Sequence, residues 1–285
     1  MKYNLHTHTI RCNHAQGDDR EYVESAIMAG IKVLGFSDHC PQFFPNTDYY
    51  SNFRMKPEEF EGYVKSIRSL QAEYRDDIEI LLGLETEYYP ETYGKFMEFI
   101  TPYKLDYLIM GQHFVGNEYD QNSYYSSRPN RDETLLERYV AQVCEGLRKG
   151  VFTYIAHPDI LYYEGEPGYY RDKMAELCVC AKELGIPLEY NLLGMTNKKC
   201  YPKPEFWKLA SEIGNDVLIG YDAHNPDALQ NDEAFFNCVL NLNAMGLSPM
   251  RAIRQAAPKS LTLSGSSAWR ASKISLALAV LPTKA

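Results

Sequence analysis

Residues 3–8 read YNLHTH and join a short apolar run to a pair of histidines. Side chains two residues apart in a strand share a face, so His6 and His8 can point at one ion. An apolar run followed by a potential metal ligand recurs along the chain. These runs cover residues 3–5, 33–36, 78–84, 107–110, 151–155 and 217–219. The pattern predicts that ligands are delivered from the ends of many parallel strands.

Segments with helical periodicity lie between these runs, at residues 60–70, 136–147 and 174–184. Pro57 suits the first turn of the first segment, Asp132 is a candidate N-cap of the second, and Gly150 and Gly185 are stop signals. With one more apolar run at 186–190, seven strands alternate with helices, which predicts parallel βαβ units. This α/β pattern favours a (β/α)7 TIM-like barrel, in which chemistry lies at the carboxyl ends of the strands.

The chain has 285 residues, a formal charge of -9 and a pI near 5.3. Because phosphate backbones and anionic membranes recruit concentrated Lys and Arg, this balance argues against nucleic acid or a membrane as a stable partner. The seven cysteines are odd in number and unpatterned, which fits a reducing compartment. No signal peptide fits before the first strand, so we expect a cytoplasmic protein.

A single barrel domain is expected over residues 1–260, because α/β barrels routinely use this length as one domain. Residues 261–285 differ in character, with few charges and no acid. Their apolar run at 274–281 is too short to span a bilayer. A terminal strand, a packed tail and a non-native extension are the alternatives for this C-terminal tail.

Nine side chains are candidate metal ligands: His6, His8, His14, His39, Glu85, His113, His157, Asp222 and His224. Imidazoles and carboxylates suit zinc, manganese or iron, and more than four ligands predicts more than one ion. We therefore expect two to three divalent transition-metal ions, with Glu85 able to bridge two of them. Asp18 or Asp19 is an alternative to His14, and Glu87 is expected to support the ligands from behind.

The motifs around these ligands are shared with a known family. They are His6-Thr7-His8, Cys12-Asn13-His14, Ser37-Asp38-His39, Gly83-Leu84-Glu85, His113, His157 and Asp222-Ala223-His224. As a set they resemble the PHP family, named for polymerase and histidinol phosphatase, over about residues 1–260. The stretch Glu189-Tyr190-Asn191, followed by Tyr201-Pro202, further resembles the histidinol-phosphatase branch.

The resemblance implies a distorted seven-stranded barrel that holds up to three metal ions. It implies one ion held by His6, His8, Glu85 and Asp222, a second held by Glu85, His113 and His157, and a third held by His14, His39 and His224. Two loops depart from the branch: Cys40-Pro41-Gln42-Phe43-Phe44 follows His39, and the first basic residue after His157 is Arg171. Both loops are expected to touch the substrate, so the departures bear on substrate and not on metals.

The expected function is a metal-dependent phosphomonoesterase acting on a small phosphorylated substrate. The resemblance implies hydrolysis of L-histidinol phosphate to L-histidinol and inorganic phosphate, a step of histidine biosynthesis. A hydroxide bridging two ions would attack phosphorus in line while the ions neutralise the equatorial oxygens. His39 or Asp222 would supply or relay the leaving-group proton.

Loop residues are candidates for binding the rest of the substrate. The basic candidates are Arg11, Arg54, Arg128, Arg171, Lys198 and Lys199, for each of which a solvated surface charge is the ordinary alternative. The aromatic candidates, which would close over an imidazole or another ring, are Phe43, Phe44, Tyr49, Tyr50, Tyr124 and Tyr125.

Three alternative functions remain compatible with the sequence. A phosphoesterase of the same fold acting on a nucleotide or sugar phosphate shares every predicted ligand. A hydrolase of carbon–nitrogen bonds also uses His-x-His on a first strand, but no apolar run here ends in the lysine expected of it. A non-catalytic metal-binding barrel is disfavoured because an unused site should have gaps in its ligand set.

Overall fold

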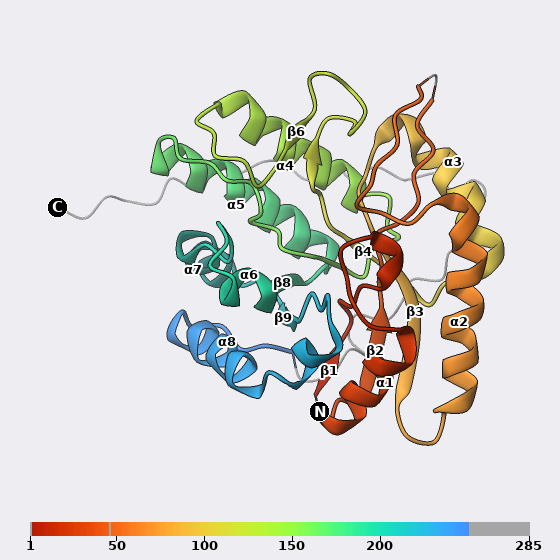
Figure 1. The fold of residues 1–285 in the computed structure, drawn as a ribbon. Helices are drawn as coiled ribbons and strands as arrows, with labels where there is room; N and C mark the ends of the chain where they lie inside the picture. Colours follow the sequence, from red (N-terminus) through yellow and green to blue (C-terminus); the bar gives the residue numbers. More distant parts are fainter. Residues whose placement is uncertain (1, 46, 251–285) are drawn as a thin grey trace, which may run out of the picture.

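The computed structural model describes residues 2–45 and 47–250, which build a parallel sheet surrounded by helices (Figure 1). The strands follow the order β1-β2-β3-β4-β7-β8-β9, and every neighbouring pair is parallel. Their bounds are β1 Tyr3–Asn4, β2 Val33–Phe36, β3 Glu79–Thr86, β4 Tyr107–Met110, β7 Tyr154–Ile155, β8 Leu188–Asn191 and β9 Val217–Gly220. All seven predicted strands are confirmed, although β7 begins at Tyr154 and not at residue 151.

The first and last strands meet just beyond their carboxyl ends. Thr7 forms a parallel bridge with Ala223. In this bridge His8 N donates to Ala223 O at 2.9 Å, and Ala223 N donates to His6 O at 3.1 Å. The sheet is therefore nearly closed into a barrel, which confirms the predicted α/β fold, a distorted (β/α)7 TIM-like barrel.

Helices lie around the outside of the sheet (Figure 1). The α-helices are α1 Asp19–Met28, α2 Phe60–Glu73, α3 Pro90–Ile100, α4 Glu133–Leu147, α5 Pro167–Leu184, α6 Leu192–Thr196, α7 Pro204–Ile213 and α8 Asp232–Ala244. The 3-10 helices are η1 Ile10–Cys12, η2 Pro57–Glu59, η3 Thr101–Tyr103 and η4 Pro226–Gln230. The three predicted helices are confirmed as α2, α4 and α5. Asp132 caps α4 by accepting from Thr134 N, and Gly185 ends α5 at a φ of 64°.

The barrel interior is packed beneath the carboxyl ends of the strands. Tyr107 lies at the centre of this small apolar cluster, and its hydroxyl donates to Leu5 O at 2.8 Å. A Cβ on Gly35 or Gly83 would lie only 2.3 or 2.4 Å from Tyr107 atoms, so both glycines are needed to admit the ring. The filled interior leaves the strand ends as the place where polar side chains can gather.

A two-stranded antiparallel sheet, which the sequence did not predict, follows β4. It pairs β5, Phe114–Val115, with β6, Tyr124–Tyr125. Tyr124 and Tyr125 were expected in a loop, but they lie in this short strand. The two residues of β5 or of β6 are too few to show a period and, unlike β1 and β7, lie in no apolar run that the sequence analysis recognised.

The described chain ends beside the barrel. Met250 N donates to Val217 O at 2.8 Å, and the Tyr3 hydroxyl donates to Met250 O at 3.0 Å. The last ten residues of the expected barrel domain and the predicted tail at 261–285 lie outside the described residues. Within residues 2–45 and 47–250, no helix combines the length and apolar character needed to cross a membrane.

Candidate metal centre

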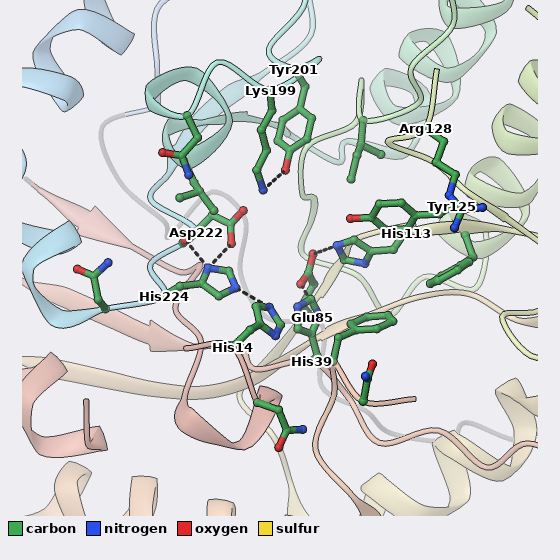
Figure 2. Close-up of a pocket in the computed structure, with 18 of the residues that line it drawn as sticks. His14, His39, Glu85, His113, Tyr125, Arg128, Lys199, Tyr201, Asp222 and His224 are labelled. Atoms are coloured by element: carbon green, nitrogen blue, oxygen red, sulfur yellow. Dashed lines mark hydrogen bonds and ion pairs between the residues drawn. The ribbon is translucent and has the colours of Figure 1, made fainter. Parts of the chain in front are cut away.

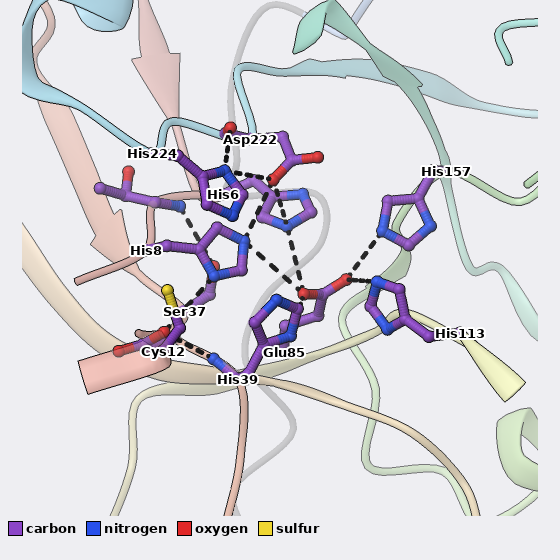
Figure 3. A network of polar contacts seen from close by, with 12 residues as sticks. His6, His8, Cys12, Ser37, His39, Glu85, His113, His157, Asp222 and His224 are labelled. Carbon is purple, nitrogen blue, oxygen red and sulfur yellow. Dashed lines mark hydrogen bonds and ion pairs between the residues drawn. The ribbon is translucent and has the colours of Figure 1, made fainter. Parts of the chain in front are cut away.

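The nine predicted ligands lie together at the carboxyl ends of the strands; Figure 3 labels all of them except His14, which Figure 2 labels. They are contributed by the ends of β1 (His6, His8), β2 (His39), β3 (Glu85), β4 (His113), β7 (His157) and β9 (Asp222, His224), and by the turn after η1 (His14). Seven of the nine are buried, His224 is half-buried and His14 is exposed. The predicted convergence of ligands from many strands is therefore observed.

Glu85 is the centre of this cluster, and its two oxygens face different groups of imidazoles. Distances from Oε2 are 3.0 Å to His39 Nδ1, 3.6 Å to His6 Nε2 and 3.6 Å to His8 Nε2. Distances from Oε1 are 2.8 Å to His157 Nε2 and 3.6 Å to His113 Nε2. A carboxylate placed between two sets of donors in this way has the geometry of a bridging ligand.

Asp222 faces the same space from β9. Its Oδ1 lies 3.1 Å from His8 Nε2, 3.5 Å from His6 Nε2 and 3.4 Å from His224 Nδ1. Two donors that each lie 2.0–2.2 Å from one tetrahedral ion are roughly 3.3–3.6 Å apart. Five of the eight separations around Asp222 and Glu85, at 3.4–3.6 Å, match donors arranged about an ion, whereas those at 2.8, 3.0 and 3.1 Å are shorter.

Several buried nitrogen and oxygen atoms of the cluster, all able to bind a metal, have no hydrogen-bond partner among the described residues. They are His6 Nε2, His8 Nε2, His39 Nδ1, Glu85 Oε2 and Asp222 Oδ1. An unsatisfied buried polar atom costs about 1–3 kcal/mol, so five in one cluster would be a heavy penalty for a purely structural arrangement. Bound cations would satisfy all five, and the residues present fit that role.

Three carboxylates hold the imidazoles from behind. Glu189 Oε1 lies 2.7 Å from His6 Nδ1, Glu87 Oε1 lies 3.1 Å from His113 Nδ1, and Asp38 Oδ1 lies 3.4 Å from His8 Nδ1. A carboxylate at one ring nitrogen orients the ring and presents the other nitrogen to a metal. Glu87 therefore lies behind a candidate ligand, as the sequence predicts. The same role of Glu189 and Asp38 was not predicted.

The backbone around the cluster is shaped by close approach. His157 and Asp222 have φ values of 31° and 53°, a region that costs non-glycine residues about 1–3 kcal/mol each. A Cβ on Gly111 would lie 1.9 Å from Glu85 Oε1, and one on Gly220 would lie 1.7 Å from Glu189 Oε1. Glycine at positions 111 and 220 therefore leaves room for the carboxylates of Glu85 and Glu189.

Comparison with known proteins agrees with this architecture. Residues 4–192 match the PHP domain. The chain belongs to the PHP family. A Deinococcus radiodurans protein named probable histidinol-phosphatase is 33% identical over 230 residues, which cover 78% of this chain and 85% of that protein. The Bacillus subtilis histidinol-phosphatase is 26% identical, covering 79% of this chain and 94% of that protein.

A solved PHP relative has the same fold. The histidinol phosphate phosphatase of Lactococcus lactis superposes with a TM-score of 0.67 at 20% identity, covering 87% of this chain and 95% of that chain. That structure is a complex with zinc, L-histidinol and phosphate.

The third group of predicted PHP ligands lies nearer the surface. His14 Nε2 is 3.0 Å from His224 Nε2, and the His14 and His39 ring centroids are 5.3 Å apart. The two alternatives to His14 are engaged elsewhere: Asp18 caps α1, and Asp19 forms a two-bond ion pair with Arg11. The structure therefore places His14 in the cluster and leaves both aspartates out of it.

Burial and neighbouring charges shift the pKa values of several groups in this PHP site. Burial raises the pKa of Glu85, but His113 and His39 outweigh it and hold that pKa well below its usual range. Burial also lowers the pKa of His39 well below its usual value, and burial together with His8 lowers the pKa of His224 to about 3. An ionised Glu85 and neutral His39 and His224 are the forms that bind metals, whereas His6 and His8, whose pKa values are raised by neighbouring carboxylates, must lose a proton on binding.

A pocket of about 840 Å³ opens over the PHP site (Figure 2). Phe53, Phe114, Tyr125 and Tyr201 line it, together with the basic residues Arg128 and Lys199. Of the six aromatic candidates, Tyr125 lines the pocket, whereas Phe43 packs on Phe99 and Phe44 on Tyr49. Sequence reasoning missed Phe53 and Phe114, and it quoted Tyr201 only as part of the branch resemblance; the folding of separate loops brings the three together.

The other four basic candidates do not line this pocket. Arg11 pairs with Asp19, and Lys198 borders a neighbouring cavity. Arg171, predicted in a loop, lies in α5 and pairs with Glu212. Arg54 is buried and bonded to carboxylates. Their charges are compensated or directed elsewhere, which leaves Arg128 and Lys199 as the predicted cations at the pocket.

Proposed function

We propose that the protein is a metal-dependent phosphomonoesterase of the PHP family whose substrate is L-histidinol phosphate. The observation that carries this proposal is the cluster of buried ligand atoms around Glu85, five of which have no hydrogen-bond partner among the described residues, beside a pocket lined by two cationic side chains. Two or three divalent ions, of zinc, manganese or iron, would be held in the three ligand groups that the family resemblance implies.

Divalent ions at such a centre supply a nucleophile at neutral pH and neutralise charge on the phosphoryl group. Arg128 and Lys199, on the pocket wall, would bind phosphate oxygens and orient the ester for in-line attack. His39 and Asp222 also line the pocket and are the candidates for passing a proton to the leaving alkoxide.

The pocket walls support a small ring-bearing substrate. Phe53 and Phe114 stack with centroids 5.8 Å apart, and Tyr125 packs on Phe114 at 5.4 Å. An imidazole ring would find apolar and edge contacts against them. The unusual residues 40–44 do not line the pocket, and Arg128 and Lys199 provide positive charge that the loop after His157 lacks. Both sequence departures are therefore compatible with histidinol phosphate.

Phosphate release from a panel of monoesters, with zinc or manganese, tests the proposal. The panel contains histidinol phosphate, a nucleoside monophosphate, a sugar phosphate and p-nitrophenyl phosphate. We expect a specificity constant for histidinol phosphate at least about 100-fold above the others, which needs roughly 3 kcal/mol of differential transition-state binding. A preference for the nucleotide or sugar phosphate would refute the substrate, and no release by fully metallated protein would refute the activity.

A further inference from the structure

Arg54 is a buried cation that links three loops behind the pocket. Its side chain is 2% exposed and makes two bonds of 2.9 Å to Glu87, Nη1 to Oε2 and Nη2 to Oε1. Nη2 also donates to Glu118 Oε2, and Nη1 donates to Cys40 O at 3.1 Å. These partners follow β2, β3 and β5, so one guanidinium joins three segments that are distant in sequence.

On one side, this network reaches the candidate metal ligands. Glu87 accepts both Arg54 bonds and also lies 3.1 Å from His113 Nδ1. His113 Nε2 in turn faces Glu85 Oε1 at 3.6 Å. The position of the Glu87 carboxylate, and therefore the angle of the His113 ring, depends on Arg54.

On the other side, the network reaches the aromatic wall of the pocket. Glu118 follows β5 and also accepts from the Tyr49 hydroxyl at 2.9 Å, which ties the loop after β2 to the β5–β6 pair. Phe53 has its ring 4.5 Å from the Arg54 guanidinium carbon and 5.4 Å from the His39 ring. Arg54 and Glu118 thus set where Phe53 meets Phe114.

We propose that Arg54 is a positioning residue that fixes the His113 side of the metal centre through Glu87 and the Phe53–Phe114 wall of the substrate pocket through Glu118. The inference rests on the proposed function and adds a residue that would contribute to substrate specificity. Arg54 itself lies behind the pocket and does not line it. Its planar fork suits this task because it binds one carboxylate with two parallel bonds while still reaching a second.

Three variants distinguish the two arms of the network, which are the Glu87 link to His113 and the Glu118 link to the aromatic wall. Glu87→Gln removes the anion behind His113, Glu118→Gln weakens only the link to the wall, and Arg54→Met removes both. Arg68→Met is the matched control, because Arg68 also bonds a carboxylate, Asp106, but on α2 and away from the pocket. The glutamate variants keep Arg54 paired with one carboxylate, so they remain informative if Arg54→Met does not fold.

Two readouts that need no turnover are measured on each variant. Zinc affinity is obtained by competition with a chelator. The ratio of the dissociation constants of methylphosphonate and phenylphosphonate, measured on the zinc-loaded protein, reports the aromatic wall. We expect Glu87→Gln to weaken zinc binding by about 10–100-fold. Glu118→Gln should lower the phenyl preference by about tenfold and leave zinc affinity unchanged.

Arg54→Met should show both losses, and Arg68→Met neither. Equal effects of Glu87→Gln and Glu118→Gln on both readouts would refute the two-arm arrangement, as would an Arg54→Met protein that matches the control. Failure of the monoester panel would refute the proposed function alone, because neither readout depends on phosphate release.

Discussion

Replacing Glu189 by glutamine tests how the metal centre is held. Glu189 is fully buried, and both of its oxygens accept hydrogen bonds. Oε1 faces His6 Nδ1 at 2.7 Å, whereas Oε2 accepts from His157 N at 3.0 Å and from Asn191 Nδ2 at 3.1 Å. A glutamine side chain has one acceptor oxygen, so it must present an NH2 group to one of these two sets of donors.

The less costly choice turns the NH2 group toward His6, since the other orientation opposes two donors. His6 Nδ1 must then accept, which moves the ring proton to Nε2, the atom that faces Glu85 and Asp222. A protonated Nε2 cannot bind a metal. Leaving a buried donor unmatched costs about 1–3 kcal/mol, and loss of such a supporting carboxylate typically weakens metal binding 10–100-fold. These two magnitudes agree, because each factor of ten corresponds to about 1.4 kcal/mol.

The assay is zinc affinity by chelator competition, together with metal content after dialysis. Glu183→Gln is the control, since it makes the same charge change on the exposed surface of α5. We expect Glu189→Gln to bind zinc about 10–100-fold more weakly than the control. Equal affinities of the two variants would show that His6 does not depend on Glu189, and the reasoning from tautomers would fail.

Three further predictions concern the same centre. Glu85→Gln should lower both metal content and turnover, because an amide cannot supply two anionic oxygens; near-normal values in elemental analysis and phosphate release would contradict a bridging role. Gly111→Ala should displace Glu85, since the new Cβ would lie 1.9 Å from Oε1, and metal content after dialysis should fall. Burial lowers the pKa values of His6 and His8, but neighbouring carboxylates outweigh it, raising that of His6 well above its usual value and that of His8 to about 9. Zinc binding to metal-free protein at pH 7 should therefore release about two protons, and calorimetry in buffers of different ionisation enthalpy should detect them.

The raised pKa of His8 also makes the stability of the metal-free protein depend on pH. The folded-state pKa of His8 lies above its unfolded value, so its contribution to stability is complete below about pH 6.5. That contribution is lost as pH rises toward 9. Thermal unfolding without metals should accordingly show a falling Tm across this range.

The strands and most ligands were predictable because their signals are local. A buried parallel strand is a continuous apolar run, and the side chain that follows it must lie at the carboxyl edge of the sheet. His39 after 33–36 and His157 after 151–155 are placed by this rule alone. His14 is different, since it follows a 3-10 turn, and its place in the cluster depends on contacts with His224 across the barrel.

The features that the sequence did not reveal depend on pairs far apart in the chain. Arg54 was one of six candidate phosphate contacts because it lies in a loop, with a solvated surface charge as the ordinary alternative, yet it is buried and its partner Glu118 is 64 residues away. Glu189 sits inside a strand, where nothing local marks it as the partner of His6, 183 residues away. Such pairings are consequences of the closed barrel and carry no periodic signal.

Because Thr7 bridges Ala223, residues that lie together in the metal centre are synthesised far apart in time. The partners of His6 that follow β9 leave the ribosome up to 218 residues after it, the difference between positions 6 and 224. At 5–20 residues per second this delay is roughly 10–45 s. During that time the nascent chain lacks Asp222 and His224, so the ligand set around His6 and His8 is incomplete. A chain that stops before β9 would carry Glu85 and most of the imidazoles but would lack Asp222, His224 and the Thr7–Ala223 bridge, so we expect its metal centre to be incomplete.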